Sequence, residues 1–215
     1  MVNSRKISRL DRILHELDEA LRTVSAPAPR PTRPSPAAEH EVRELESKQA
    51  QHVAGLMRVN HAGEVCAQGL YRGQALTARQ ASTKAAMACA AEEEIDHLAW
   101  CEQRLSELHS EPSRLNPLWY TLSFVLGAGA GALSDRLSLG FVAATEEQVC
   151  QHLQSHLEKL PVEDGKSRAI LEQMVADEQH HATRALEEGA IPLPEPVKRA
   201  MSVAARAMTY TSYRV

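Results

Sequence analysis

The sequence predicts an all-α protein. Aromatic residues make up only 4% of the 215 residues, and long stretches repeat apolar residues at alternating steps of three and four. That spacing places side chains on one face of a helix. The length is enough for one medium-sized domain with a substantial core. The formal net charge of −4 gives no electrostatic argument for nucleic acid, so we expect no nucleic-acid partner.

The first expected element is an amphipathic helix over residues 1–24, followed by a proline-rich linker over residues 25–42. Acidic residues argue against a transit peptide, and no uninterrupted apolar stretch suggests a secretory signal. We expect the helix to pack on the body or on a partner rather than on a membrane surface. Its apolar positions are Ile7, Leu10, Leu14, Leu17 and Leu21.

The remaining residues, 43–215, are expected to form one helical domain. "EPSRLNP" at 111–117, "PVEDGK" at 161–166 and "GAIPLPEP" at 189–196 mark breaks between helices. A last amphipathic helix follows at about 195–209. The four core helices are predicted at about 43–79, 83–110, 134–160 and 166–188.

The segment 118–144 differs from the rest because it is almost wholly apolar. Its charge-free part, Leu118 to Leu133, is shorter than the roughly 20 residues that a membrane span needs. Two interpretations stay open: a buried helix that packs closely through its glycines, or a segment that enters a membrane or lines an apolar pocket. "GAGAG" follows no predicted strand, so a dinucleotide site is not expected.

The four cysteines form no CxxC pair and are expected to be small buried residues in a reducing compartment. They are Cys66, Cys89, Cys101 and Cys150.

The second core helix places a glutamate on its apolar face. Met87, Ala91, Leu98 and Cys101 define the face, and Glu94 occupies a position within it. His97 projects beside Glu94, because residues three apart are neighbours on a helix. The adjacent acids fall off this face and are expected to be solvated: Glu92, Glu93 and Asp96.

The other core helices repeat the pattern. In the fourth, Glu178 and His181 face inward, whereas Asp177 and His180 face away. The first and third helices each contribute one inward glutamate, Glu64 and Glu146, with Glu147 off the face.

A single inward glutamate is usually a boundary residue or half of a salt bridge. Four of them, two with a histidine three residues on, would leave several buried charges uncompensated, at a cost of several kcal/mol each. Two divalent metals would balance the four carboxylates, and oxygen-rich sites with one nitrogen per metal suit iron or manganese. The pattern therefore predicts a four-helix bundle with a dinuclear metal centre. Hydroxylation, iron oxidation, peroxide disproportionation and radical generation all remain possible on such a scaffold.

The segment "MRVNHAGEVCAQGLY" at 57–71 resembles the first-ligand signature of the Coq7 family, the di-iron 3-demethoxyubiquinol hydroxylases of ubiquinone biosynthesis. "EEEIDHLAWC", "AATEEQVCQHL" and "DEQHHA" match the family's other ligand segments in order. The resemblance implies a ferritin-like bundle, two iron ions per chain and O₂ as co-substrate. Carried over residue by residue, the metal ligands are Glu64, Glu94, His97, Glu146, Glu178 and His181.

The resemblance further implies a monooxygenase that acts on a polyprenyl quinol at the cytoplasmic face of the membrane. His152 matches a family histidine near the metal site and is the catalytic candidate; the next position, often aromatic in the family, is Leu153. Other ubiquinone-biosynthesis proteins and a second copy of the chain are possible partners. The last helix is expected to face the membrane, with ordinary packing on the bundle as the alternative. Its apolar positions are Val197, Met201, Ala204 and Met208.

Two alternatives remain at this stage. One is a ferritin-like ferroxidase or rubrerythrin-like protein that handles iron or peroxide. The absence of a CxxC pair and the apolar segment 118–144 argue against it. The other is a scaffold without enzymatic activity, against which the complete ligand set argues.

Overall fold

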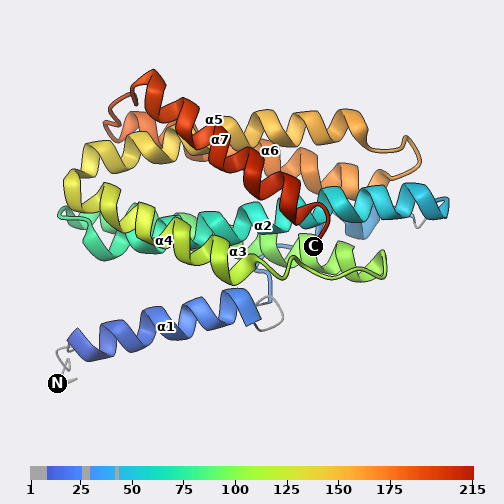
Figure 1. Ribbon diagram of the computed structural model, residues 1–215, viewed down its shortest axis with the longest axis horizontal. Coiled ribbons are helices and arrows are strands. Elements are labelled where there is room, and N and C mark those ends of the chain that lie inside the picture. Colours follow the sequence, from blue (N-terminus) through green and yellow to red (C-terminus); the bar gives the residue numbers. More distant parts are fainter. Residues whose placement is uncertain (1–8, 26–29, 42–43) are drawn as a thin grey trace.

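The computed structural model describes residues 9–25, 30–41 and 44–215, and this part of the chain contains helices and no strands (Figure 1). The predicted all-α class is confirmed. Ile7 of the predicted N-terminal face lies outside the described residues, as does the side chain of Leu10. The helices are α1 (Arg9–Ser25), the 3₁₀ helix η1 (Pro36–Glu39), α2 (Ser47–Thr77), α3 (Ala81–Glu107), α4 (Asn116–Leu133), α5 (Asp135–Lys159), α6 (Gly165–Glu187) and α7 (Glu195–Ser212).

Two helical hairpins, α2–α3 and α5–α6, form the bundle. Each hairpin packs extensively within itself, and the two meet mainly where α3 faces α6 and where α4 joins α2 to α5. The turns are fixed by side chains that cap helix ends. The Asp135 carboxylate accepts hydrogen bonds from the backbone N–H groups of Arg79 and Gln80 at the start of α3, at 2.9 and 2.8 Å. Asp164 similarly accepts from the backbone N–H of Ser167 at the start of α6.

The apolar interior is divided into two main clusters along the bundle axis. One contains Met57, Trp100, Leu153 and Met174. The other contains residues from the opposite halves of the same helices: Tyr71, Met87, Val142 and Ala185. On each helix the predicted ligands fall between these two clusters. The layer of predicted glutamate and histidine ligands, here called the acidic layer, therefore has apolar packing on both sides along the bundle axis.

The apolar segment 118–144 is two helices, because the chain breaks at Ser134 between α4 and α5. The inner face of α4 packs closely on α2 through glycines: a Cβ added to Gly127 would overlap the backbone of Leu70. The outer face is apolar and exposed, with Leu122, Val125 and Leu126 between 48 and 63% accessible. Within the described residues, no helix combines the length and the apolar character needed to cross a bilayer.

The N-terminal elements differ from the expectation. Helix α1 contacts the body through Ala20 and Val24, while its predicted face of Leu14, Leu17 and Leu21 is 54 to 60% exposed. These leucines therefore do not pack on the body, and their packing on a partner stays a prediction. The linker is not simply extended either, since η1 lies within it and Ala37 is buried in the core.

Helix α7 crosses the bundle over α2 and α5 (Figure 1). Its predicted apolar face is divided: Met201 and Met208 are half-buried, whereas Ala204 and Val197 are exposed. Packing on the bundle thus accounts for part of that face.

Candidate metal centre

The four predicted inward glutamates are buried at the middle of the bundle. Glu64, Glu94, Glu146 and Glu178 are each 3% exposed or less, and His97 and His181 are 0 and 6% exposed. The prediction that each core helix buries one glutamate, and that α3 and α6 add a histidine, is confirmed. Glu147 is exposed, as its position off the apolar face predicted.

Two of the carboxylates span both histidines. Glu94 places Oε2 2.8 Å from Nδ1 of His97 and Oε1 3.2 Å from Nδ1 of His181. Glu178 does the same in the opposite sense, with Oε1 3.2 Å from His97 and Oε2 3.0 Å from His181. A carboxylate with one oxygen toward each of two nitrogen donors is placed to bridge two metals.

The other two carboxylates, Glu64 and Glu146, lie on either side of the Glu94–Glu178 pair. An oxygen of Glu64 lies 3.8 Å from Nδ1 of His97. Glu146 accepts a hydrogen bond from the hydroxyl of Tyr71. Donor atoms of Glu64, Glu94, His97 and Glu178 all lie within 4.8 Å of one another. The set is therefore organised as two histidines, two spanning glutamates and one further glutamate at each end.

The donor set fits a pair of divalent metals. Oε1 of Glu94 is buried, and its 3.2 Å contact with Nδ1 of His181 lacks the geometry of a hydrogen bond, which leaves a carboxylate oxygen for a metal to satisfy. Burial raises the pKa values of Glu64 and Glu146 well above the usual range. Burial lowers the pKa of His181, but Glu178 and Glu94 outweigh that effect and raise it to about 12. The acidic layer thus retains protons where divalent cations would balance its charge.

An acid from the facing helix supports the outer nitrogen of each histidine. Nε2 of His97 lies 2.9 Å from Oδ2 of Asp177, and Nε2 of His181 lies 2.6 Å from Oε2 of Glu93. Both acids lie off the inward faces, as the sequence predicts, and both are partly exposed. What the sequence analysis missed is that each contacts the outer nitrogen of a histidine on the facing helix, where it can fix the orientation of the imidazole. The sequence contained a signal, because each acid directly precedes the glutamate of a Glu-x-x-His pair.

Asp96 is buried, although helical periodicity predicts that it is solvated. Its exposed fraction is 1%. Its carboxylate accepts hydrogen bonds from the backbone N–H of Thr32 and from Nε of Arg33, at 2.6 and 2.7 Å. The linker covers this face of α3, so a position that helical periodicity places off the core is buried by a different segment.

Tyr71 is a functional candidate that sequence reasoning treated only as core. It is fully buried, and its hydroxyl donates to Glu146. Burial and the neighbouring Glu146 charge raise the pKa of Tyr71 well above its ordinary value, so the hydroxyl keeps its proton. A tyrosine two turns from a ligand on the same helix face was the available signal.

His152 lies further along α5 than Glu146, and its ring packs against His156, with 4.0 Å between centroids. His156 in turn contacts Oδ1 of Asn60 through Nδ1 at 2.8 Å. Burial lowers the pKa of His152 to about 4, so the ring is neutral at pH 7. Its predicted catalytic role stays a prediction.

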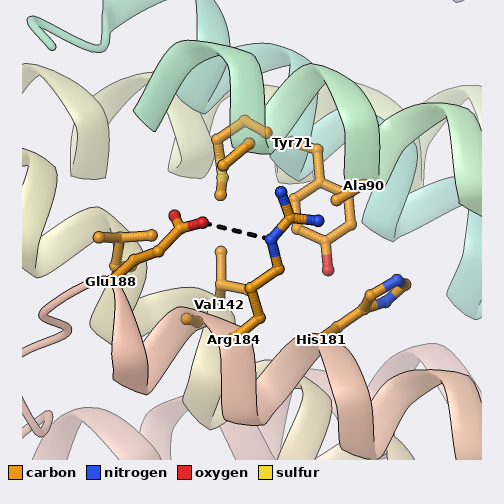
Figure 2. Close-up of a pocket in the computed structure, with 10 residues that line it drawn as sticks. Tyr71, Ala90, Val142, His181, Arg184 and Glu188 are labelled. Atoms are coloured by element: carbon orange, nitrogen blue, oxygen red, sulfur yellow. Dashed lines mark hydrogen bonds and ion pairs between the residues drawn. The ribbon is translucent and has the colours of Figure 1, made fainter. Parts of the chain in front are cut away.

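A pocket of about 300 Å³, counting its open mouth, reaches the His181 end of the site (Figure 2). Its walls are apolar and come from α3 and α5, with Met87, Ala90 and Val142 among them. Arg184 extends across it from α6 and pairs with Glu188 at 3.2 Å. Tyr71 and His181 also line it, so the pocket leads from the surface toward the candidate centre.

The cysteine expectation holds in part. Cys101 and Cys150 are buried and Cys66 is half-buried, but Cys89 is exposed, and its thiol lies 3.4 Å from the Glu93 carboxylate.

Comparison with known proteins agrees with this geometry. The model of the family "Ubiquinone biosynthesis protein COQ7" matches residues 51–212, which contain all six candidate ligands. The chain belongs to the COQ7 family. It is 60% identical to a 3-demethoxyubiquinol 3-hydroxylase of Azotobacter vinelandii and 58% identical to one of Pseudomonas syringae. A relative of the same name from Stutzerimonas stutzeri is 57% identical. Each alignment covers 100% of both chains, so this COQ7 protein is similar to them over α1 and the linker as well as the bundle.

Proposed function

We propose that this protein is a monooxygenase that hydroxylates the ring of a demethoxyubiquinol in ubiquinone biosynthesis, at a di-iron centre. The observation that carries the proposal is the pair of carboxylates, Glu94 and Glu178, that each span His97 and His181. The full-length similarity to named hydroxylases supports the choice of this chemistry among those that a dinuclear centre permits.

The residues of the chain would hold and isolate the metals. His97 and His181 would supply one nitrogen ligand each, Glu94 and Glu178, which face both histidines, would supply carboxylate oxygens between them, and Glu64 and Glu146 would supply the remaining carboxylates. Iron bound there would supply the redox chemistry of a monooxygenation, in which one atom of O₂ enters the quinol ring and the other is reduced to water with two electrons from an external reductant and two protons. Tyr71 would hold Glu146 in place through its hydroxyl, and the apolar clusters would keep water from the reacting atoms.

The quinol ring would approach through the pocket beside His181. Its apolar walls suit a substituted aromatic ring, and its inner end carries both Tyr71 and His181. The opposite end of the site, at His97, is fully buried beneath Trp100 and the linker. Access from the His181 end agrees with the exposed fractions of the two histidines, which are 6% for His181 and 0% for His97.

A polyprenyl tail calls for contact with a bilayer, and we place the protein at the cytoplasmic membrane as a peripheral protein. The exposed face of α4 carries no charged residue from Asn116 to Leu133. Exposed apolar side chains of this kind favour an interface between water and lipid.

Labelled oxygen tests the chemistry. Iron-loaded protein is supplied with a short-chain demethoxyquinol, a reductant and ¹⁸O₂, and the quinone is analysed by mass spectrometry. A product heavier by one labelled oxygen, lost in His181→Ala, supports the hydroxylase. Iron that oxidises rapidly without quinol, accumulates in the protein and leaves no label in the ring would establish the ferroxidase alternative instead.

Vesicle co-sedimentation tests the location. Wild-type protein should sediment with vesicles, and Leu122→Lys combined with Val125→Lys should remain in solution, because charges in the exposed face of α4 oppose lipid contact. Val162→Lys is the control: Val162 is 87% exposed in the α5–α6 turn, away from that face. Wild-type protein that ignores vesicles would contradict the membrane assignment.

A further inference from the structure

The segment that joins α1 to the bundle is tied to the two helices that carry the Glu-x-x-His pairs. Thr32 and Arg33 bind Asp96 of α3, and Arg33 also binds Asp177 of α6, with 2.8 Å between Nη1 and Oδ2. Just beyond, η1 packs on α6 and Ala37 enters the core. A stretch that lies outside the matched family region, residues 51–212, thus connects the outer surfaces of both helices.

One of these contacts leads directly to a candidate ligand. Oδ2 of Asp177 accepts from Nη1 of Arg33 and lies 2.9 Å from Nε2 of His97. Gln173 holds the other oxygen of Asp177 at 2.9 Å. The carboxylate is therefore fixed at both oxygens, and Arg33 and His97 share one of them.

The guanidinium of Arg33 is fixed as well. It lies 4.9 Å from the centre of the Trp100 ring, within the range of a cation–π interaction. Trp100 itself lies against His97, with 5.4 Å between ring centroids. The indole and the two aspartates thus hold the guanidinium in place, and Arg33 reaches His97 through the carboxylate of Asp177. A flexible lysine could not form the two-aspartate fork that a planar guanidinium forms here.

We propose that Arg33 is a positioning residue of the metal centre: acting through Asp177, it fixes the orientation of His97 and so sets the affinity of one of the two metal positions. The proposal rests on the metal centre of the proposed function. It also gives the N-terminal linker a role, because Arg33 lies in the linker and contacts Asp96 of α3 and Asp177 of α6.

The other histidine lacks an equivalent arrangement among the described contacts. The acid behind His181 is Glu93, whose side chain is 42% exposed and whose second contact is the thiol of Cys89. The arginine near this end, Arg184, pairs with Glu188. The effect of Arg33 is therefore expected at one metal position and not at both.

Anaerobic titration of the metal-free full-length protein with Co(II), followed by its visible absorption, tests this proposal. Wild-type protein should take up two ions. Arg33→Ala should weaken one of the two by about tenfold, the low end of the range for residues that support metal-binding histidines. Arg30→Ala is the matched control, an exposed arginine three positions earlier in the same linker, and should bind as wild type does.

Two further variants separate positioning from stability. Arg33→Lys keeps the charge and should recover part of the lost affinity. Combined with Asp177→Asn, Arg33→Ala should add nothing, because both act through the same contact. If Arg33→Ala lowers the melting temperature and leaves both affinities at the wild-type value, or weakens both equally, the linker is only a structural brace and the proposal is overturned. Wild-type protein that takes up no Co(II) would overturn the metal centre, and the role of Arg33 with it.

Discussion

His97 and His181 occupy equivalent positions in two similar hairpins, yet their surroundings differ. Both face Glu94 and Glu178 through Nδ1. The outer nitrogen of His97 is held by Asp177, which is anchored by Arg33 and Gln173 beneath Trp100. The outer nitrogen of His181 is held by the half-exposed Glu93, beside an open pocket.

The difference shows how a repeated motif can place two histidines in unequal surroundings. The Glu-x-x-His spacing makes the inner contacts alike, because they depend only on helix geometry. The outer contacts depend on which segment covers each helix. At the His97 end the linker covers the surface, and at the His181 end an apolar pocket is open to solvent.

The most severe test of this comparison removes a spanning carboxylate. Glu94→Ala or Glu178→Ala should abolish binding of both metals, because each glutamate faces both histidines. Glu64→Ala or Glu146→Ala should reduce the content toward one metal per chain. Elemental analysis of purified variants measures this. Equal losses from all four would show that spanning and end positions do not differ.

Blocking the pocket tests which end admits substrate. Ala90→Trp should fill the pocket and lower turnover more than tenfold while the metal content stays at the wild-type value, because overpacking is confined to the pocket. Ala88→Trp, on the exposed side of the same helix, should retain activity. Normal turnover by Ala90→Trp would move the entrance elsewhere.

Asp177 and Glu93, the acids that contact the outer nitrogens of His97 and His181, should differ in their effect on metal affinity. Asp177→Asn should weaken metal binding by about 10 to 100-fold, the range for such partners, because it also breaks the contact with Arg33. Glu93→Gln should have a smaller effect, since its carboxylate is already solvated. Competition with a chelator measures both affinities. A larger loss in Glu93→Gln would reverse the proposed order of the two ends.

The smallest expected effect is on the pH dependence of stability, and it comes from His61, a buried histidine outside the candidate metal centre. Burial is the cause of its lowered pKa. Burial lowers the pKa of His61 to about 4, against about 6.5 in an unfolded chain. Between these values the unfolded chain binds more protons, so stability is complete above about pH 6.5 and falls as the pH falls toward 4.

From about pH 7 to about pH 5.5, this group should remove about 1 kcal/mol from the free energy of unfolding. Urea denaturation at both pH values measures the loss, and His61→Gln should lack that share of it. An unchanged pH dependence in this variant would show that His61 is protonated equally in both states.

Most of the bundle and the inner part of the site could be predicted from the sequence. The apolar spacing set the four core helices, and the same spacing decided that Glu64, Glu94, Glu146 and Glu178 face inward. Within one helix the direction of a side chain follows from its position along the chain, so no knowledge of other segments is needed.

The remaining features depend on segments far apart in the sequence. Asp96 is off the apolar face of α3 and is buried only because Thr32 and Arg33 lie over it. The leucines of α1 repeat at helical spacing but face outward, because the body offers its contact surface to Ala20 and Val24 instead. Periodicity determines which residues share a face, whereas only the tertiary structure decides what each face meets, since that depends on the shape and charge of distant partners.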